Sequence, residues 1–312
     1  MSRSTRLLRT QAGSLLIVTL WIVTILVVLV VAIARTLSLE VRLTKYSLAR
    51  EQARALARSG VYLAMERLKR DVEPGDKPYD WLEDDWAAET QPVSDSRANG
   101  SVEIEILDLD RKLNVNAATV DQLTQLSGSS DVAHALVDYR DQDQEGAWEA
   151  AMEAHAYYPK NGPLIAPEEL REIPGQTTET LEALEQFTVA VPEPAPRTKV
   201  NVNTASREVL RVVGLPMLAE EILQFRAQGH YFTALAPTLV TESPVVPPPF
   251  DPAAPEFLNA QLALQVNSDT FEIHATGRLN SPKVRYRINA VVKRTGCPTA
   301  TQTPCIVAWR EG

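Results

Sequence analysis

Cysteine and histidine are scarce in this chain of 312 residues. Its two cysteines exclude a disulfide-dense scaffold and a four-cysteine zinc site. The four histidines are scattered along the sequence without the spacing of metal ligands, at positions His134, His155, His230 and His274. Metal-dependent hydrolysis is therefore not expected.

The familiar catalytic patterns are lacking too. The sequence has no nucleophile elbow, no histidine close to a cysteine and no phosphate-binding glycine loop. We therefore expect a protein that is not an enzyme.

Positive charge is in short supply. The chain has 31 Lys and Arg against 40 Asp and Glu, which gives a formal net charge of −9. Nucleic-acid affinity rests largely on Lys and Arg contacts with phosphates, so this balance argues against nucleic acid as a partner. A local basic patch is not excluded by the average.

Apolar residues are present in ordinary amount but unevenly placed. The mean hydropathy is −0.15, yet residues 14–34 contain no charged side chain. About 20 apolar residues at 1.5 Å per residue span a bilayer core of roughly 30 Å. The preceding residues carry three arginines and no acid, so the positive-inside rule keeps residues 1–13 in the cytoplasm. In a bacterium this predicts one transmembrane helix in the inner membrane, with the C-terminal domain in the periplasm.

A secretory signal peptide is the alternative interpretation of this segment. Its apolar region is usually 7–15 residues long and ends at small residues, and Ala32-Ile33-Ala34 is a weak match to such a cleavage site. The longer run favours an anchor that is kept.

The helical pattern continues beyond the apolar run. Residues 35–70 contain no proline and one glycine. Small and apolar residues recur at steps of three or four, at Ala49, Ala53, Leu56, Gly60, Ala64 and Leu68. We predict one helix over residues 14–70, roughly 85 Å long, with its first half in the membrane and its second half on a globular head.

Strand patterns occur in four segments, one early and three late. Residues 101–109 alternate apolar and polar side chains, and β-branched and aromatic residues are enriched in 270–277, 284–293 and 305–309. We predict an α+β fold, in which the long N-terminal helix packs on an antiparallel sheet formed by a domain of residues 71–110 and 257–312. Residues 111–256 are predicted to be an inserted all-α domain.

An internal repeat divides this insert. Residues 112–123 are echoed by residues 199–210, an offset of 87 residues. Thr119 and Ser206 stand at matching positions and are predicted to cap helices. We therefore expect two helix-hairpin-helix-like subdomains, separated by the proline-rich residues 192–196 and followed by a second proline-rich segment, residues 244–255.

The N-terminus resembles the type IV prepilin signal: an arginine-rich leader, Gly13 and an uncharged apolar run. The resemblance implies that a prepilin peptidase cuts after Gly13, which makes residues 1–13 the leader and Ser14 the first mature residue, open to methylation. The fifth mature position, usually Glu in pilins, is Val18. An apolar fifth residue is typical of the minor pseudopilin K family of type II secretion, and suits a subunit at the tip of a fibre.

Further motifs resemble the same general secretion pathway protein K family. Residues 136–146 and 161–175 are similar to its signature stretch, and with the leader and tail the resemblance covers nearly the whole chain. It implies assembly at the tip of the periplasmic pseudopilus, which initiates the fibre for protein export across the outer membrane. The implied partners are the I-type and J-type minor pseudopilins and the major pseudopilin.

A second resemblance supplies an alternative function. The repeat is similar to the helix-hairpin-helix module of membrane-anchored competence DNA receptors. That module binds phosphate through backbone N–H groups of a glycine hairpin at a helix N-terminus. Pro216 lacks such a group and Asp131 would repel phosphate, so we favour structural packing over DNA binding.

Three acidic residues form a candidate calcium site. Asp141, Asp143 and Glu145 alternate before Gly146, as in the opening of a calcium loop, but the expected twelfth-position Glu is Met152. From these residues alone, a solvated acidic loop is an equally open interpretation. Calcium binding is a property of the pseudopilin K family, and this favours calcium as a cofactor.

Cys297 and Cys305 bracket a short segment between two predicted strands. In an oxidising periplasm we expect a disulfide, which would stabilise the fold by roughly 2–3 kcal/mol. Two free thiols are the alternative.

Overall fold

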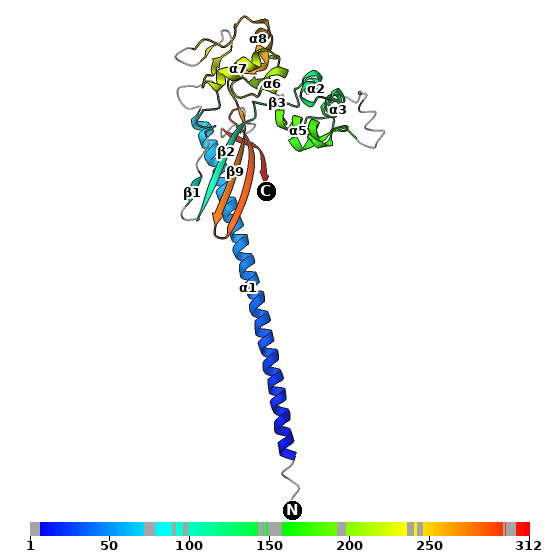
Figure 1. Cartoon of the computed structure of the whole chain (residues 1–312), viewed down its shortest axis with the longest axis vertical. Helices are drawn as coiled ribbons and strands as arrows, with labels where there is room; N and C mark the ends of the chain where they lie inside the picture. Colours follow the sequence, from blue (N-terminus) through cyan, green and yellow to red (C-terminus); the bar gives the residue numbers. More distant parts are fainter. Residues whose placement is uncertain are drawn as a thin grey trace, which may run out of the picture.

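A long helix bears a head of helices and strands at one end (Figure 1). The computed structural model describes residues 7–71, 79–88, 92–95, 99–142, 146, 148, 158–191, 198–235, 240–241, 246–295, 297 and 304–312. Helix α1 spans Leu7–Arg70 and ends on the basic residues Arg67, Lys69 and Arg70, which suit the negative end of a helix dipole. The predicted helix over 14–70 is confirmed, and the structure extends its start back to Leu7.

The sheet has five antiparallel strands in the order β1-β2-β9-β10-β11. Their bounds are Val93–Asp95, Gly100–Asp108, Thr270–Asn280, Lys283–Lys293 and Cys305–Glu311. Strand β2 pairs with β9 along its whole length. The chain therefore leaves the sheet after β2 and returns to the neighbouring strand only at β9, which confirms the predicted helix-on-sheet fold with a long interruption.

Helix α1 packs on one face of this sheet through small residues. Gly60 and Gly277 mark the closest approach, because a Cβ atom on Gly277 would overlap the carbonyl oxygen of Ala53 and lie 2.8 Å from Ala57 N. Small side chains let the helix backbone approach the sheet closely. The buried members of this core are Ala49, Ala53, Ala57, Val61, Ala64, Leu68, Trp86, Ile106, Phe271, Ile273, Ala275, Leu279, Tyr286, Ile288, Ala290 and Val292.

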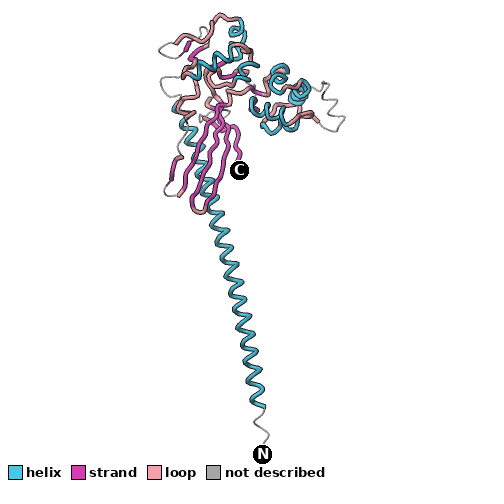
Figure 2. The backbone as a smooth tube through the Cα atoms, viewed as in Figure 1, coloured by secondary structure: helices cyan, strands magenta, loops and turns pink. Residues whose placement is uncertain are grey.

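Helices and very short strands follow one another between β2 and β9. The helices are α2 (Val120–Ser127), α3 (Ser130–Arg140), η1 (Pro167–Glu172), α5 (Thr178–Phe187), α6 (Arg207–Val212), α7 (Leu218–Ala227), α8 (Pro255–Ala260) and η2 (Gln261–Ala263). The strands are β3 (Leu113–Asn114), β4 (Thr188–Val189), β5 (Val200–Asn201), β6 (Phe232–Ala234), β7 (Val240–Thr241) and β8 (Leu264–Gln265). Figure 2 shows the helices of this region gathered at the end of the head opposite the N-terminus.

The prediction of an all-α insert is not confirmed, because these strands form three two-stranded sheets. Strands of two or three residues are too short to show alternation in the sequence. The proline-rich residues 192–196 lie outside the described residues.

The internal repeat is visible in the fold. We call β3 to β4 the first repeat and β5 to β8 the second repeat, since each begins and ends with one strand of a parallel pair. Thr119 caps α2 by accepting a hydrogen bond from Gln122 N, and Ser206 caps α6 by accepting one from Val209 N. Both predicted caps are therefore present.

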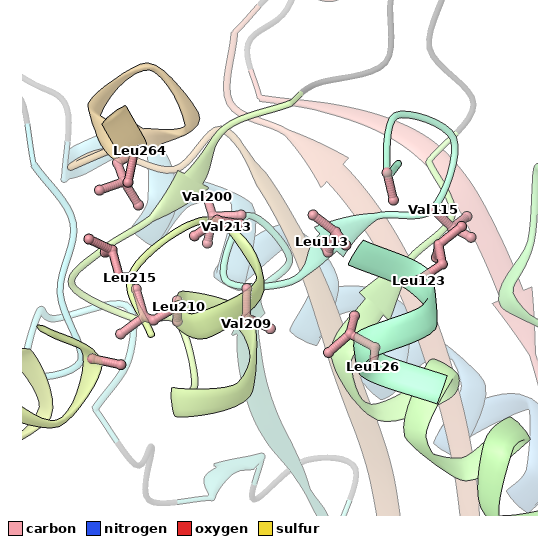
Figure 3. Close-up of a cluster of buried hydrophobic side chains, with 14 of the residues drawn as sticks. Leu113, Val115, Leu123, Leu126, Val200, Val209, Leu210, Val213, Leu215 and Leu264 are labelled. Atoms are coloured by element: carbon pink, nitrogen blue, oxygen red, sulfur yellow. The ribbon is translucent and has the colours of Figure 1, made fainter. Parts of the chain in front are cut away.

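The two repeats share one hydrophobic core. Figure 3 shows side chains of the first repeat beside those of the second. The labelled residues are Leu113, Val115, Leu123 and Leu126 from the first, and Val200, Val209, Leu210, Val213, Leu215 and Leu264 from the second. The repeats thus form one packed unit.

Candidate functional site

The first half of α1 is an exposed apolar surface. Every side chain from Ser14 to Leu48 is exposed, and Trp21 is 66% exposed. An 18-residue window of this segment has a mean hydropathy of 3.2 and no buried part. Among the described residues, α1 is the one helix that is long and apolar enough to cross a membrane. So much exposed apolar surface is unfavourable in water and marks a region that lipid or other helices cover.

The threonines of the uncharged residues 14–34 bond to their own helix. Thr19 Oγ1 donates to Leu16 O at 2.9 Å, and Thr24 Oγ1 donates to Leu20 O at 2.7 Å. Hydroxyl groups that bond within the helix bring no unsatisfied donor into hydrocarbon. Residues 14–34 of α1 are therefore chemically suited to lipid.

The predicted cleavage position lies inside this continuous helix. Gly13 is part of α1, while Ser14 and Val18 follow on its exposed half. Residues 1–6 of the predicted leader lie outside the described residues. Cleavage after Gly13 stays a prediction.

The second half of α1 is tied to the C-terminal strand by Glu311. Arg54 Nη2 lies 2.6 Å from Glu311 Oε2, and Arg58 Nη2 lies 3.3 Å from Oε1. Trp309 Nε1 and the Tyr286 hydroxyl each donate to this carboxylate at 2.8 Å. The Trp309 hydrogen bond is the largest cause, and with the other donors it lowers the pKa of Glu311 to about 2.

Arg294, which follows β10, forms a second set of ion pairs with the segment that follows α1. Its side chain is 8% exposed, and Nη2 lies 3.1 Å from a carboxylate oxygen of Asp71 and 2.9 Å from one of Asp80. Oxygens of Asp71, Asp80 and Asp84 lie within 4.8 Å of one another, a spacing that could hold a cation. Arg294 already supplies that positive charge. Burial, with the Asp84 charge next, raises the pKa of Asp71 to about 6.

Asp108 lies at the end of β2 in a third polar cluster. It is 2% exposed, and its Oδ2 accepts hydrogen bonds from Thr204 Oγ1 at 2.5 Å and Ser268 Oγ at 2.7 Å. Asp110 N donates to Oδ1 at 2.8 Å. Burial, with the Asp110 charge next, raises the pKa of Asp108 to about 7. This cluster was not predicted, since its members stand far apart in the chain.

A matching pair of hydrogen bonds fixes a loop in each repeat. In the first, Asn116 donates to Leu164 O and accepts from Leu164 N, both at 2.8 Å. In the second, Asn203 donates to Phe232 O at 2.9 Å and accepts from Phe232 N at 2.8 Å. The asparagines stand 87 residues apart, as the repeat requires. The two asparagines therefore have the same structural role in their repeats.

The helix N-termini that a DNA-binding module would offer to phosphate are already occupied. Glu256 Oε1 accepts from Met217 N at 2.8 Å and from Leu218 N at 3.1 Å at the start of α7. Ser129 Oγ accepts from Val132 N at 3.3 Å at the start of α3. A carboxylate at the α7 terminus excludes phosphate from the same amides, which agrees with the interpretation of the repeats as packing units.

The predicted calcium ligands are only partly placed. Asp141 follows α3, and its backbone N donates to Val137 O at 3.0 Å. Asp143 and Glu145 lie outside the described residues. The structure therefore does not show whether the three converge, and calcium binding stays a prediction.

Cys297 and Cys305 are joined in the structure as a disulfide, with their Cα atoms 5.9 Å apart. The bond links the chain just after β10 to the start of β11. It therefore bridges the two ends of the connection that leads into the edge strand.

Two comparisons with known proteins bear on this arrangement. Residues 104–193 match the sequence model of the family described as type II secretion system (T2SS), protein K. No curated protein matches the chain significantly. Among solved structures, the chain is similar to one from the crystal structure of the GspK-GspI-GspJ complex of the enterotoxigenic Escherichia coli type 2 secretion system.

That structural match has a TM-score of 0.65 at 19% sequence identity, and covers 86% of this chain and 99% of the other. At this identity the likeness concerns the fold. The family match covers the end of β2 and the first repeat, where the sequence motifs resembled the same family. Residues 104–193 therefore match the type II secretion system protein K family, and the whole chain shares the fold of the solved structure.

Proposed function

We propose that this protein is a minor pseudopilin that assembles at the tip of the periplasmic pseudopilus and helps to initiate it for protein export. The observation that supports this proposal most directly is the division of α1. It is one continuous helix whose first half is exposed and largely apolar and whose second half packs in the head. A helix divided in this way suits a subunit that is first held in a membrane and then packed among other helices. The family match supports the proposal.

The cellular location of the protein is inferred from the charged residues that flank the apolar part of α1. We place the protein in the bacterial inner membrane with a single pass over residues 14–34. The basic residues before this span keep the start of the chain in the cytoplasm. The head then lies in the periplasm, where its work is assembly rather than catalysis.

Two features favour the tip over a position within the fibre. The helical region lies at the end of the head opposite the free half of α1 (Figure 1), where it would obstruct a subunit stacked above. Val18 supplies no carboxylate for the amino terminus of a neighbour. The solved complex joins GspK with GspI and GspJ, and we propose the corresponding I-type and J-type pseudopilins, with the major pseudopilin, as partners here.

Mass spectrometry of the mature N-terminus tests the class of protein. We expect Ser14 as the first residue only in cells that contain prepilin peptidase. Gly13→Leu should leave the chain uncut, whereas Ala34→Leu, at the signal-peptide alternative, should change nothing. A mature chain that starts after Ala34 would show that the segment is a signal peptide.

Co-purification with the I-type and J-type subunits tests assembly. Leu39→Glu together with Leu43→Glu places charge on the exposed part of α1 beyond the predicted span, and should abolish co-purification. Glu182→Gln, on the exposed surface of α5, should leave it intact. Co-purification that survives the paired substitution would contradict assembly through this surface.

Duplex DNA tests the alternative function. We expect no binding at micromolar protein in low or moderate salt, because the chain is acidic and its helix N-termini are occupied. Salt-sensitive micromolar binding would favour a DNA receptor instead.

Calcium is proposed as a ligand on the sequence pattern and the family resemblance. Added calcium should then raise the unfolding temperature, and the double substitution Asp141→Ala, Asp143→Ala should remove the increase. An unchanged response in that variant would exclude these two residues as ligands.

A further inference from the structure

Acidic groups outnumber basic groups in the buried polar region at the end of β2. Asp80, Asp108 and Asp110 are 1%, 2% and 7% exposed. Arg294 bonds Asp80 through two nitrogens, while no lysine or arginine of the described residues bonds Asp108. Ionised carboxylates placed together in a dry site disfavour one another. Asp108 is therefore the group at which a proton would relieve the excess of negative charge.

The partners of Asp108 suit either charge state. Thr204 and Ser268 reach its Oδ2 with hydroxyl groups, which can donate to a carboxylate and, after rotation, accept from a carboxylic acid. Asn201 Nδ2 lies further away, at 3.5 Å. A guanidinium, by contrast, can only donate, as Arg294 does to Asp80. The hydroxyl partners of Asp108 therefore do not confine it to one charge state.

The same cluster attaches the second repeat to the sheet. Asn201, in β5, donates through Nδ2 to Asp80 O at 3.2 Å and to Ser268 Oγ at 2.7 Å. Asn201 N also donates to Asp110 O at 2.9 Å. Asp108 ends β2, and Ser268 immediately precedes β9. A change of charge at Asp108 therefore acts where three segments of the chain meet.

We propose that Asp108, Thr204, Asn201 and Ser268 form a proton-sensitive joint, which holds the second repeat firmly on the sheet when Asp108 is protonated and loosens when Asp108 ionises.

Other charges surround the joint from each neighbouring element. Asp110, Arg111 and Lys112 follow β2, Glu272 lies on β9, and Asp80 and Asp84 precede the sheet. Arg294 and Asp71 complete the group at the ends of β10 and α1. Arg294 is shared between Asp71 and Asp80. The field at Asp108 is therefore dominated by carboxylates, which favours its protonated form.

The direction of the pH effect follows from burial. In the unfolded chain Asp108 would lose its proton near its ordinary pKa of 3.8, whereas burial and Asp110 hold its pKa at about 7 in the folded protein. The folded state thus binds a proton that the unfolded state has lost. Stability from this group is fully present below pH 3.8 and declines as pH rises toward 7, with no further decline well above it.

Thermal unfolding of the full-length protein in detergent tests the joint. Between pH 6 and 8 the Tm of the wild type should fall by at least about 3 °C more than that of Asp108→Asn, whose amide imitates the protonated acid. Asp85→Asn alters an exposed carboxylate next to Asp84 in the chain and should retain the wild-type fall. An equal fall in Asp108→Asn would overturn the proposal.

Ser268→Ala provides a second test, which also applies if Asp108→Asn does not fold. This change keeps Asp108 but removes a donor that favours its ionised form, so the midpoint of the pH-dependent fall in Tm should move to higher pH. Hydrogen exchange at Asn201 N, corrected for the intrinsic effect of pH, should show the same midpoint. An unmoved midpoint would contradict the role of Asp108.

Discussion

Glu311 links β11 to α1, although the contacting residues Arg58 and Glu311 are 253 positions apart in the sequence. Its carboxylate receives Arg54 and Arg58 from the helix and Tyr286 and Trp309 from the sheet. The arginines alone would form a surface ion pair, which usually contributes little to stability. The two neutral donors fix the carboxylate between the rings, and this makes Glu311 a point of attachment for β11.

Replacing Glu311 by Gln should therefore lower the Tm and change the response to acid. The pKa of Glu311 is lowered to about 2, so its contribution is present above its ordinary pKa of 4.5 and is lost as pH falls toward 2. Acid titration of unfolding should show a shallower loss of stability between pH 4.5 and 2 in Glu311→Gln. Glu182→Gln serves as the control, and an equal acid response in Glu311→Gln and the wild type would contradict the assignment.

Asn116 and Asn203 should respond alike to substitution, because each amide bonds both backbone groups of one residue. Asn116→Ala and Asn203→Ala each leave a backbone N–H and C=O without that partner, so each should destabilise the protein by about 2 kcal/mol. Chemical denaturation measures the change, with the exposed Asn259→Ala as control. Unequal effects, with one variant like the control, would show that the repeats do not use the asparagine in the same way.

At the scale of elements, the contact between α1 and β9 depends on the absence of side chains. Gly277 faces the backbone of α1, and an added Cβ would overlap Ala53 O. Backbone atoms inside a packed helix cannot move aside as a flexible side chain can. The helix would have to shift away from the sheet along several turns.

Gly277→Ala should accordingly destabilise the head by about 3 kcal/mol. Gly162→Ala is the matched control, because the nearest atom to its added Cβ is Lys160 O at 3.9 Å, and it should change stability by less than about 0.5 kcal/mol. Denaturant unfolding compares the two. Equal stabilities would mean that α1 can move away from the sheet at little cost.

The sequence predicted the elements whose patterns are local. The long helix, the strand near residues 101–109 and the caps Thr119 and Ser206 each follow from neighbouring residues, and the structure confirms them. The short parallel pairs were missed because two residues carry no periodicity. Such pairs depend on the tertiary fold.

The polar clusters were missed for another reason. Asp108 meets Thr204 and Ser268, and each residue alone resembles many surface residues in composition. Only the fold brings them together. The exposed half of α1, by contrast, was predictable because a long uncharged run is itself the signal.

At the scale of the whole molecule, the exposed half of α1 makes no contribution to the core of the head. The buried residues of the helix begin at Ala49. The head should therefore fold without the preceding part, whereas the stripe from Ala49 to Leu68 is part of its core. Anchor and head are separable at this boundary.

A chain that starts at Ser38 should be soluble without detergent and keep a Tm within about 3 °C of the full-length protein. A chain that starts at Ser59 loses Ala49, Ala53 and Ala57 from the core and should be unfolded or aggregated. Circular dichroism and thermal unfolding distinguish the two. An unfolded chain from Ser38 would show that the exposed half of α1 supports the head.

The pairing of β2 with β9 has a consequence for synthesis. Every residue from 109 to 269 must be made before the two strands can meet, which takes roughly 10–30 s at 5–20 residues per second. Throughout that interval the apolar stripe of α1 is not covered by β9 and β10, and the edge of β2 is not paired with β9. Because Leu109 N donates to Thr270 O at 2.9 Å, folding of the two repeats brings the ends of this long stretch together. Folding of the repeats therefore helps β2 and β9 to pair. A nascent chain whose repeats fold slowly would expose the unpaired edge of β2 to neighbouring proteins beside the membrane.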